Sequence, residues 1–172
     1  MKKLLSVLAV SLAVQQAVAQ PATFADGVLA IPQAAMIDGT NPVYYIDVQM
    51  VDNGDGTLSV VGGEQQNLVQ VDSVEVLIME SFPVQVGLAV SGYKSVPCVE
   101  LLPAAVARQD NLFTVVLAET LLGPAESCIA VIDPFETNVS LDVLGLSAGT
   151  YSVTVNGVEA EFELEMDNQP SN

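Results

Sequence analysis

The segment from Val158 to Asp167 alternates strictly between apolar and acidic residues. Because successive side chains of a β-strand point to opposite faces, this pattern predicts a half-buried strand with one apolar face and one acidic face. The apolar face holds Val158, Ala160, Phe162, Leu164 and Met166, and the acidic face holds Glu159, Glu161, Glu163, Glu165 and Asp167. Neighbouring carboxylates on this face would lie about 6.5 to 7 Å apart, too far for two of them to grip one calcium ion. The acidic face is either a solvated surface that discourages edge-to-edge aggregation or a binding face for a basic partner.

Short β-type runs separated by turn residues occupy most of the chain, and no apolar repeat at helical spacing extends over 12 residues. The runs predict strands at 24–31, 44–50, 58–60, 74–80, 84–90, 98–101, 112–119, 128–132, 139–144, 151–155 and 158–166. Residues 52–57 predict a hairpin turn, and the polar residues 62–70 predict a connection. For residues 103–108, a helical turn is left open. The spacing of the runs after residue 70 favours an antiparallel β-sandwich, so the fold class is all-β.

The first 19 residues have the features of a secretory signal peptide. Lys2 and Lys3 precede a short apolar run, and Ala17 and Ala19 form a small-residue cleavage site. We expect cleavage before Gln20 and an exported protein, periplasmic or secreted, without a membrane span.

Export would make the protein more acidic. The mature chain would keep only Lys94 and Arg108 against 21 acidic residues, a formal charge of −19. Nucleic acids and anionic membranes bind proteins through Lys and Arg, so we expect neither as a partner. Such a charge serves solubility, or it attracts a basic protein.

The chain contains two cysteines, Cys98 and Cys128. In an oxidising compartment they are expected to form one structural disulfide, which stabilises the fold by about 3 to 4 kcal/mol on the chain-entropy model. A redox or metal role has no support, because there is no C-x-x-C spacing.

The sequence contains few of the residue arrangements that enzymes use for catalysis. The absence of histidine excludes Ser-His-Asp and Cys-His arrangements. A calcium loop around Gly56 would place Val51 and Gly62 at ligand positions, so that match fails. No spacing selects a glycosidase-like carboxylate pair. We therefore expect no enzyme activity, no catalytic residue, no metal ligand and no cofactor.

Residues 141–157 resemble the end of bacterial immunoglobulin-like and fibronectin type III-like domains of uncharacterised secreted proteins. Leu146, Gly149 and Tyr151 match the leucine, the small turn and the Tyr-x-Val-x-Val strand of those families, and Asn156-Gly157 supplies a hairpin turn. The resemblance implies that the Tyr151 hydroxyl hydrogen-bonds back to the backbone at a strand corner. Two departures are the absence of tryptophan and the positions of the cysteines. The resemblance implies an immunoglobulin-like sandwich and transfers no catalytic or binding residue.

These features predict four parts of the chain: a signal peptide (1–19), an N-terminal β-hairpin region or extra strands (20–70), an immunoglobulin-like sandwich (71–167) and a tail (168–172). The favoured function is a non-enzymatic exported module that acts in binding or structural assembly through its sandwich surface. The alternative is an acidic proteinaceous inhibitor of a basic extracellular enzyme of the lysozyme or protease type. The sequence leaves the oligomeric state open.

Overall fold

The structure, a computed structural model, describes residues 21–38 and 41–169; the predicted leader lies outside these ranges. The described residues form twelve strands and no helix, so among them no helix has the length and apolarity to cross a membrane. The strands are β1 (Thr23–Ala25), β2 (Val28–Asp38), β3 (Asn41–Asp52), β4 (Leu58–Leu68), β5 (Gln70–Met79), β6 (Gln85–Lys94), β7 (Ala105–Gln109), β8 (Leu112–Val116), β9 (Ala118–Glu119), β10 (Asp133–Leu141), β11 (Gly149–Val155) and β12 (Val158–Leu164).

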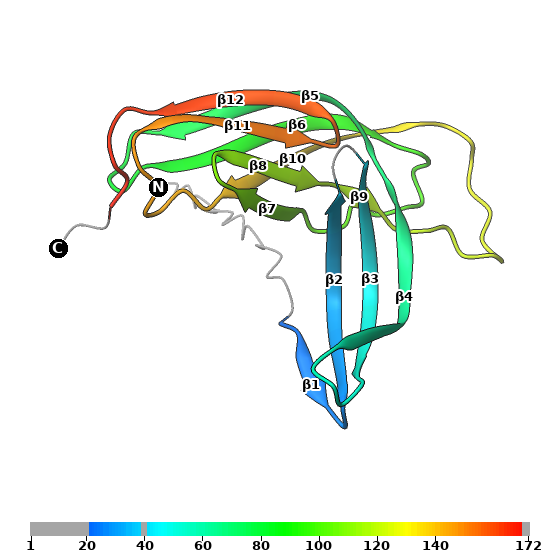
Figure 1. Cartoon of the computed structure of the whole chain (residues 1–172). Coiled ribbons are helices and arrows are strands. Elements are labelled where there is room, and N and C mark those ends of the chain that lie inside the picture. Colours follow the sequence, from blue (N-terminus) through cyan, green and yellow to red (C-terminus); the bar gives the residue numbers. More distant parts are fainter. Residues whose placement is uncertain (1–20, 39–40, 170–172) are drawn as a thin grey trace, which may run out of the picture.

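Two sheets form a β-sandwich, with strand orders β10-β6-β5 and β12-β11-β8-β7 (Figure 1). The main core lies between them and is built from alternate residues of facing strands, including Leu88, Phe113, Val153 and Phe162. The predicted all-β sandwich class is therefore confirmed. One pairing among the described strands, β8 with β11, runs parallel. It arises because the chain leaves β8, crosses through β10 of the opposite sheet and only then returns to β11.

Strands β1 to β4 form an arm that projects away from the sandwich (Figure 1). The predicted hairpin turn joins β3 and β4, where Gly54 and Gly56 both adopt positive φ and Asp52 Oδ1 accepts a hydrogen bond of 2.7 Å from Gly54 N. The turn prediction at 52–57 is therefore confirmed, since such turns need residues that tolerate positive φ.

The arm and the sandwich share continuous backbone. Only Val69 separates β4 of the arm from β5 of the sandwich, and only Leu117 separates β8 of the sandwich from β9, which pairs with β4. Val69 N donates a hydrogen bond of 3.2 Å to Leu117 O at this crossing. Asn156, in the turn between β11 and β12, adds three side-chain bonds to the same two residues. We call Val69, Leu117 and Asn156 the joint.

Several predicted boundaries are wrong. The connection predicted at 62–70 is wrong, because residues 62–68 belong to β4 and Gln70 begins β5. Pairing with β3 and β9 sets the strand conformation of 62–68 although most of these polar residues are exposed. Residues 98–101 and 128–132 lie outside the named strands, and β10 begins only at Asp133 and ends at Leu141. Both segments adjoin the disulfide, and Leu101 also forms an isolated antiparallel bridge with Glu119 of β9. The question left open at 103–108 is answered by β7, whose residues pair with β8.

The corner before β11 has the geometry that the resemblance implied. The Tyr151 hydroxyl donates a hydrogen bond of 2.8 Å to Ser147 O, and its buried ring stacks on Phe162 at a centroid distance of 5.3 Å. Asn168, which the sequence assigned to a tail, is 1% exposed. Its side chain bonds to both backbone groups of Val84 and to Val143 O, so it fastens the segment after β12 to the sandwich.

Candidate functional site

The acidic face predicted for the last strand exists on β12. Glu159, Glu161 and Glu163 are exposed, whereas the alternating residues Phe162 and Leu164 are buried in the core. Strict alternation in a half-buried strand produces this arrangement directly.

The two remaining acidic residues of the pattern lie beyond the end of β12. Glu165 and Asp167 are exposed, and Asp167 Oδ1 accepts a hydrogen bond of 2.8 Å from Ala148 N. Asp167 therefore holds the turn before β11. The structure thus groups three of the five predicted residues on one strand face.

Hydroxyl side chains lie beside the three glutamates. In the antiparallel register of β11 with β12, Thr150, Ser152 and Thr154 lie opposite Glu163, Glu161 and Glu159 respectively. The next strand, β8, places Leu112 and Thr114 beside Ser152 and Thr154. The outer face of this sheet therefore changes from carboxylates to hydroxyls across neighbouring strands.

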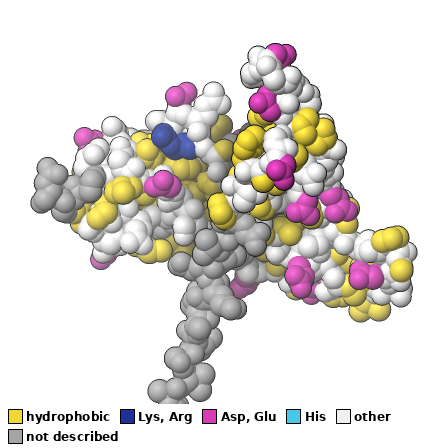
Figure 2. Space-filling view, turned by 90° about the horizontal axis from the view of Figure 1, so that it is seen from below, with side chains coloured by type: hydrophobic (Ala, Val, Ile, Leu, Met, Phe, Trp, Pro, Cys, Tyr) yellow, Lys and Arg dark blue, Asp and Glu magenta, His cyan; other side chains and the backbone are white. Residues whose placement is uncertain are grey.

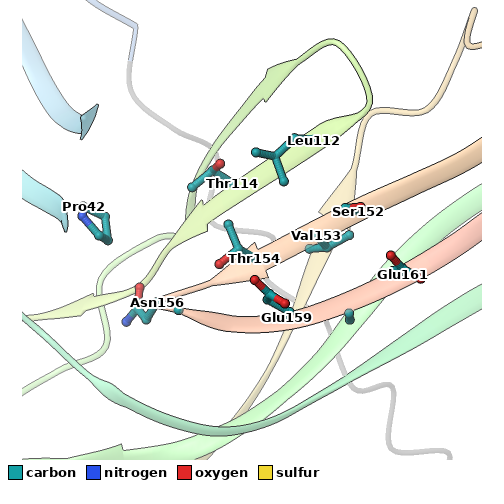
Figure 3. A pocket seen from close by; sticks show the side chains of 11 residues that line it. Pro42, Leu112, Thr114, Ser152, Val153, Thr154, Asn156, Glu159 and Glu161 are labelled. Carbon is teal, nitrogen blue, oxygen red and sulfur yellow. The ribbon is translucent and has the colours of Figure 1, made fainter. Parts of the chain in front are cut away.

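A groove of about 680 Å³ covers part of this face (Figure 3). Pro42, at the start of β3, contributes its wall on the arm side, and the sandwich contributes Leu112, Thr114, Ser152, Thr154, Asn156, Glu159 and Glu161 among others. Glu163 lies outside the groove lining. We call this hollow the acidic groove. Its volume falls within the range of about 300 to 1,000 Å³ typical of ligand pockets.

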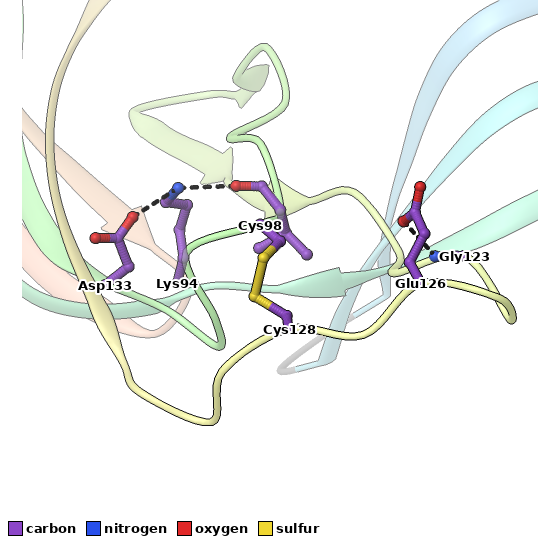
Figure 4. Close-up of a disulfide and its surroundings, with 7 residues drawn as sticks. Lys94, Cys98, Gly123, Glu126, Cys128 and Asp133 are labelled. Atoms are coloured by element: carbon purple, nitrogen blue, oxygen red, sulfur yellow. Dashed lines mark hydrogen bonds and ion pairs between the residues drawn. A yellow bond between two sulfur atoms is a disulfide. The ribbon is translucent and has the colours of Figure 1, made fainter.

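The charge of the acidic groove is not neutralised by the two basic residues of the described chain. Lys94 Nζ lies 2.9 Å from Asp133 Oδ2 and also donates to Val99 O (Figure 4). Arg108 Nη1 donates to Asp110 O. Acidic side chains are also spread over the sandwich and the arm on the face shown in Figure 2. Within the described residues, no group of three or more His, Cys, Asp or Glu is placed to hold a metal ion. Because neither described cation pairs with Glu159 or Glu161, the groove is suited to attract a positively charged group.

The second site predicted from the sequence is the disulfide. Cys98 and Cys128 are bonded, with their Cα atoms 6.1 Å apart, as predicted (Figure 4). The bond ties the segment after β6 to the long segment between β9 and β10, in which Ile129, Val131 and Ile132 are exposed.

Sequence reasoning missed the hydroxyl rows and the wall supplied by the arm. The alternation Tyr151-Ser152-Val153-Thr154-Val155 carried the signal for the hydroxyls, because residues opposite to a buried tyrosine face outward. Nothing local in the sequence indicates that Pro42 lies across the groove from β11, since that contact depends on the joint.

Residues 88–164 match the family model described as the ORF11 beta-sandwich domain. The matched range begins within β6 and ends with β12, so it contains most of the sandwich and none of β1 to β5. The match supports a β-sandwich domain. No curated protein and no solved structure matched the chain.

Proposed function

We propose that this protein is an exported, non-enzymatic binding module whose acidic groove takes a basic segment of another protein. The main support is that Glu159 and Glu161 line the same hollow. The two described basic side chains, Lys94 and Arg108, bond to other groups. Opposite charge speeds the encounter of two proteins and selects the partner. The hydroxyls of Ser152 and Thr154 add hydrogen-bonding groups, and Leu112 and Pro42 add apolar contacts.

Export is part of the proposal. The signal-like first 19 residues and the Cys98–Cys128 disulfide support it, because disulfides persist in oxidising compartments. The absence of histidine from the sequence supports a role without catalysis.

The test is binding of a defined basic probe, a fluorescent hexalysine peptide, measured by anisotropy at low and high salt. The groove variant carries Glu159→Gln and Glu161→Gln. The control variant carries Glu75→Gln and Glu136→Gln, which remove the same charge from exposed positions on β5 and β10 of the opposite sheet. At about 0.5 to 1 kcal/mol per exposed ion pair, the groove variant should bind about 5- to 30-fold more weakly.

The control variant should change the affinity by less than the groove variant does, and added salt should weaken binding of the unmodified protein. Equal losses in both variants would mean that net charge, and not the groove, attracts the peptide. Binding that is insensitive to salt would also contradict the proposal.

An inhibitor of a basic extracellular enzyme is the second candidate, and the projecting hairpin of the arm favours it. Asn53 Nδ2 donates to Thr57 Oγ1, and Thr57 donates from both its backbone and its side chain to Asp55 Oδ1. A protruding turn that its own hydrogen bonds pre-organise is suited to enter an enzyme cleft at low entropic cost. The check is the activity of a basic lysozyme and of a basic protease with and without the protein, and Thr57→Val should weaken any inhibition.

A further inference from the structure

Glu119 carries a buried carboxylate where the arm meets the sandwich. Its exposed fraction is 2%, and it belongs to β9. The alternate residues Val116 and Ala118 pack with Tyr44 on the arm side, whereas Leu117 belongs to the main core. Strand alternation therefore directs the Glu119 side chain to the sandwich side.

This carboxylate has a single polar partner in the part of the chain that the structure describes. Ser95 N donates a hydrogen bond of 2.8 Å to Glu119 Oε2. The ion pair within the described residues joins Lys94 to Asp133. The described hydrogen bonds include none to Glu119 Oε1, and this atom keeps some contact with solvent, because no buried side-chain oxygen of the described residues lacks a partner. Burying a carboxylate without a cation is costly, so such a group calls for an explanation.

A hollow beside Glu119 offers an explanation for this carboxylate. It measures about 410 Å³, and its wall includes Leu68, Tyr93 and Ile132. These three side chains are 36%, 36% and 63% exposed, so the hollow presents apolar and aromatic surface beside the polar groups of Gln70, Ser95 and Asn156. Lys94 also lines the hollow, but its ammonium group is held by Asp133 and by Val99 O. We call this hollow the Glu119 pocket.

We propose that the Glu119 pocket binds a guanidinium or alkylammonium group carried on an apolar stem. The cation would pair with the Glu119 carboxylate, which is stronger in a desolvated site than at an exposed one. A guanidinium would also stack on the Tyr93 ring, and its stem would contact Leu68 and Ile132. The cation comes either from an arginine or lysine of a partner protein or from a free organic cation. This site is separate from the acidic groove and stands whether or not the groove binds a partner.

The test uses two ligands of the same shape and different charge, N-acetyl-arginine amide and N-acetyl-citrulline amide, titrated into ¹⁵N-labelled protein. The arginine compound should shift the Ser95, Tyr93 and Ile132 amide signals in a saturable way. The neutral citrulline compound should bind about tenfold more weakly or not at all, because it cannot pair with the carboxylate. n-Butylammonium tests the ammonium class, and an arginine-containing heptapeptide that binds about tenfold more tightly than the amide would identify a protein as the source.

Three variants connect the signal to the pocket. Glu119→Gln keeps an acceptor for Ser95 N but removes the charge, and it should lower the affinity about tenfold. Tyr93→Leu removes the stacking ring at a partly exposed position and should lower it severalfold, which keeps the test decisive if Glu119→Gln does not fold. Glu75→Gln, at an exposed position on β5 that lines neither the acidic groove nor the Glu119 pocket, should leave the affinity unchanged.

Three results would overturn the proposal: no shifts at the pocket up to about 50 mM arginine compound, well above the millimolar range expected for so small a ligand; equal binding of the citrulline compound; or full affinity in a folded Glu119→Gln variant. In those cases the carboxylate would serve only to hold the Ser95 amide.

Discussion

Asn156 offers the sharpest test of how the arm is fixed to the sandwich. Its Oδ1 accepts a hydrogen bond of 3.0 Å from Leu117 N, and its Nδ2 donates to Val69 O at 2.9 Å and to Leu117 O at 2.7 Å. The residue also adopts a φ of 46°, a left-handed conformation that asparagine tolerates better than most residues. One side chain therefore connects both backbones that pass through the joint.

The substitution Asn156→Ala should cost about 4 to 6 kcal/mol of unfolding free energy. The loss of two bonds to carbonyls contributes about 1 kcal/mol each, and the Leu117 N–H, on a residue 1% exposed, is left without its partner at about 1 to 3 kcal/mol. The positive φ adds about 1 kcal/mol for alanine. Asn156→Gly should cost about 1 kcal/mol less, because glycine adopts positive φ freely.

The assay is urea unfolding followed by circular dichroism, together with hydrogen exchange of the Leu117 amide. Asn111→Ala is the matched control, because it removes one exposed bond, from Nδ2 to Thr150 O at 3.1 Å, and should cost only about 0.5 to 1 kcal/mol. A cost for Asn156→Ala no larger than that of the control would refute the reasoning. So would unchanged exchange at Leu117.

Three further outcomes are expected. The double variant Cys98→Ala and Cys128→Ala should lose about 3 to 4 kcal/mol of unfolding free energy, measured in urea, and an unchanged midpoint would show that the bond constrains nothing. Burial raises the pKa of Tyr44 above its ordinary value of 10.0. The stability that the neutral side chain contributes is therefore fully present below about pH 10 and is lost as the pH rises through the folded pKa. An ultraviolet titration should show one tyrosine that ionises above pH 10 and that is missing from Tyr44→Phe. The side-chain hydrogen bond from Thr57 lowers the pKa of Asp55 below 3.8, so its contribution is present above that value and is lost as the pH falls through the lower folded pKa. Carboxyl NMR should find this pKa raised again in Thr57→Val.

The sequence predicted best where one face of a strand is buried. The alternation in β12 follows from local chemistry, because a half-buried strand places apolar residues at every second position. The Asn156-Gly157 turn was also predictable, because both residues tolerate the positive φ that they adopt. The disulfide was also predictable, since the chain has only two cysteines.

The sequence predicted poorly where most of a strand is exposed and where an exposed loop is apolar. Residues 62–68 of β4 are mainly polar and mostly exposed apart from Gln66, and their strand conformation comes from pairing with β3 and β9. Ile129, Val131 and Ile132 are apolar and β-branched yet remain exposed in a segment beside the disulfide. In both places the local pattern was outweighed by tertiary context.

The candidate site was predicted in part. The carboxylates of Glu159 and Glu161 were identified from alternation alone, but the groove that they line needs Pro42 from the arm. Glu119 carried no signal, because a glutamate at the end of an apolar run is read as a strand terminus rather than as a buried anion. Only the three-dimensional crossing at the joint places Glu119 in a pocket.

Because only Val69 separates β4 from β5, the joint also limits how this chain can change in length over evolution. Side chains along a strand alternate between faces, so one residue inserted near Val69 would turn the arm over relative to the sandwich and carry Pro42 away from the groove. Insertions and deletions at the joint should therefore occur in pairs or be absorbed by a bulge, as already happens between Val71 and Ser73. The direction in which the arm points is thus encoded in a residue count.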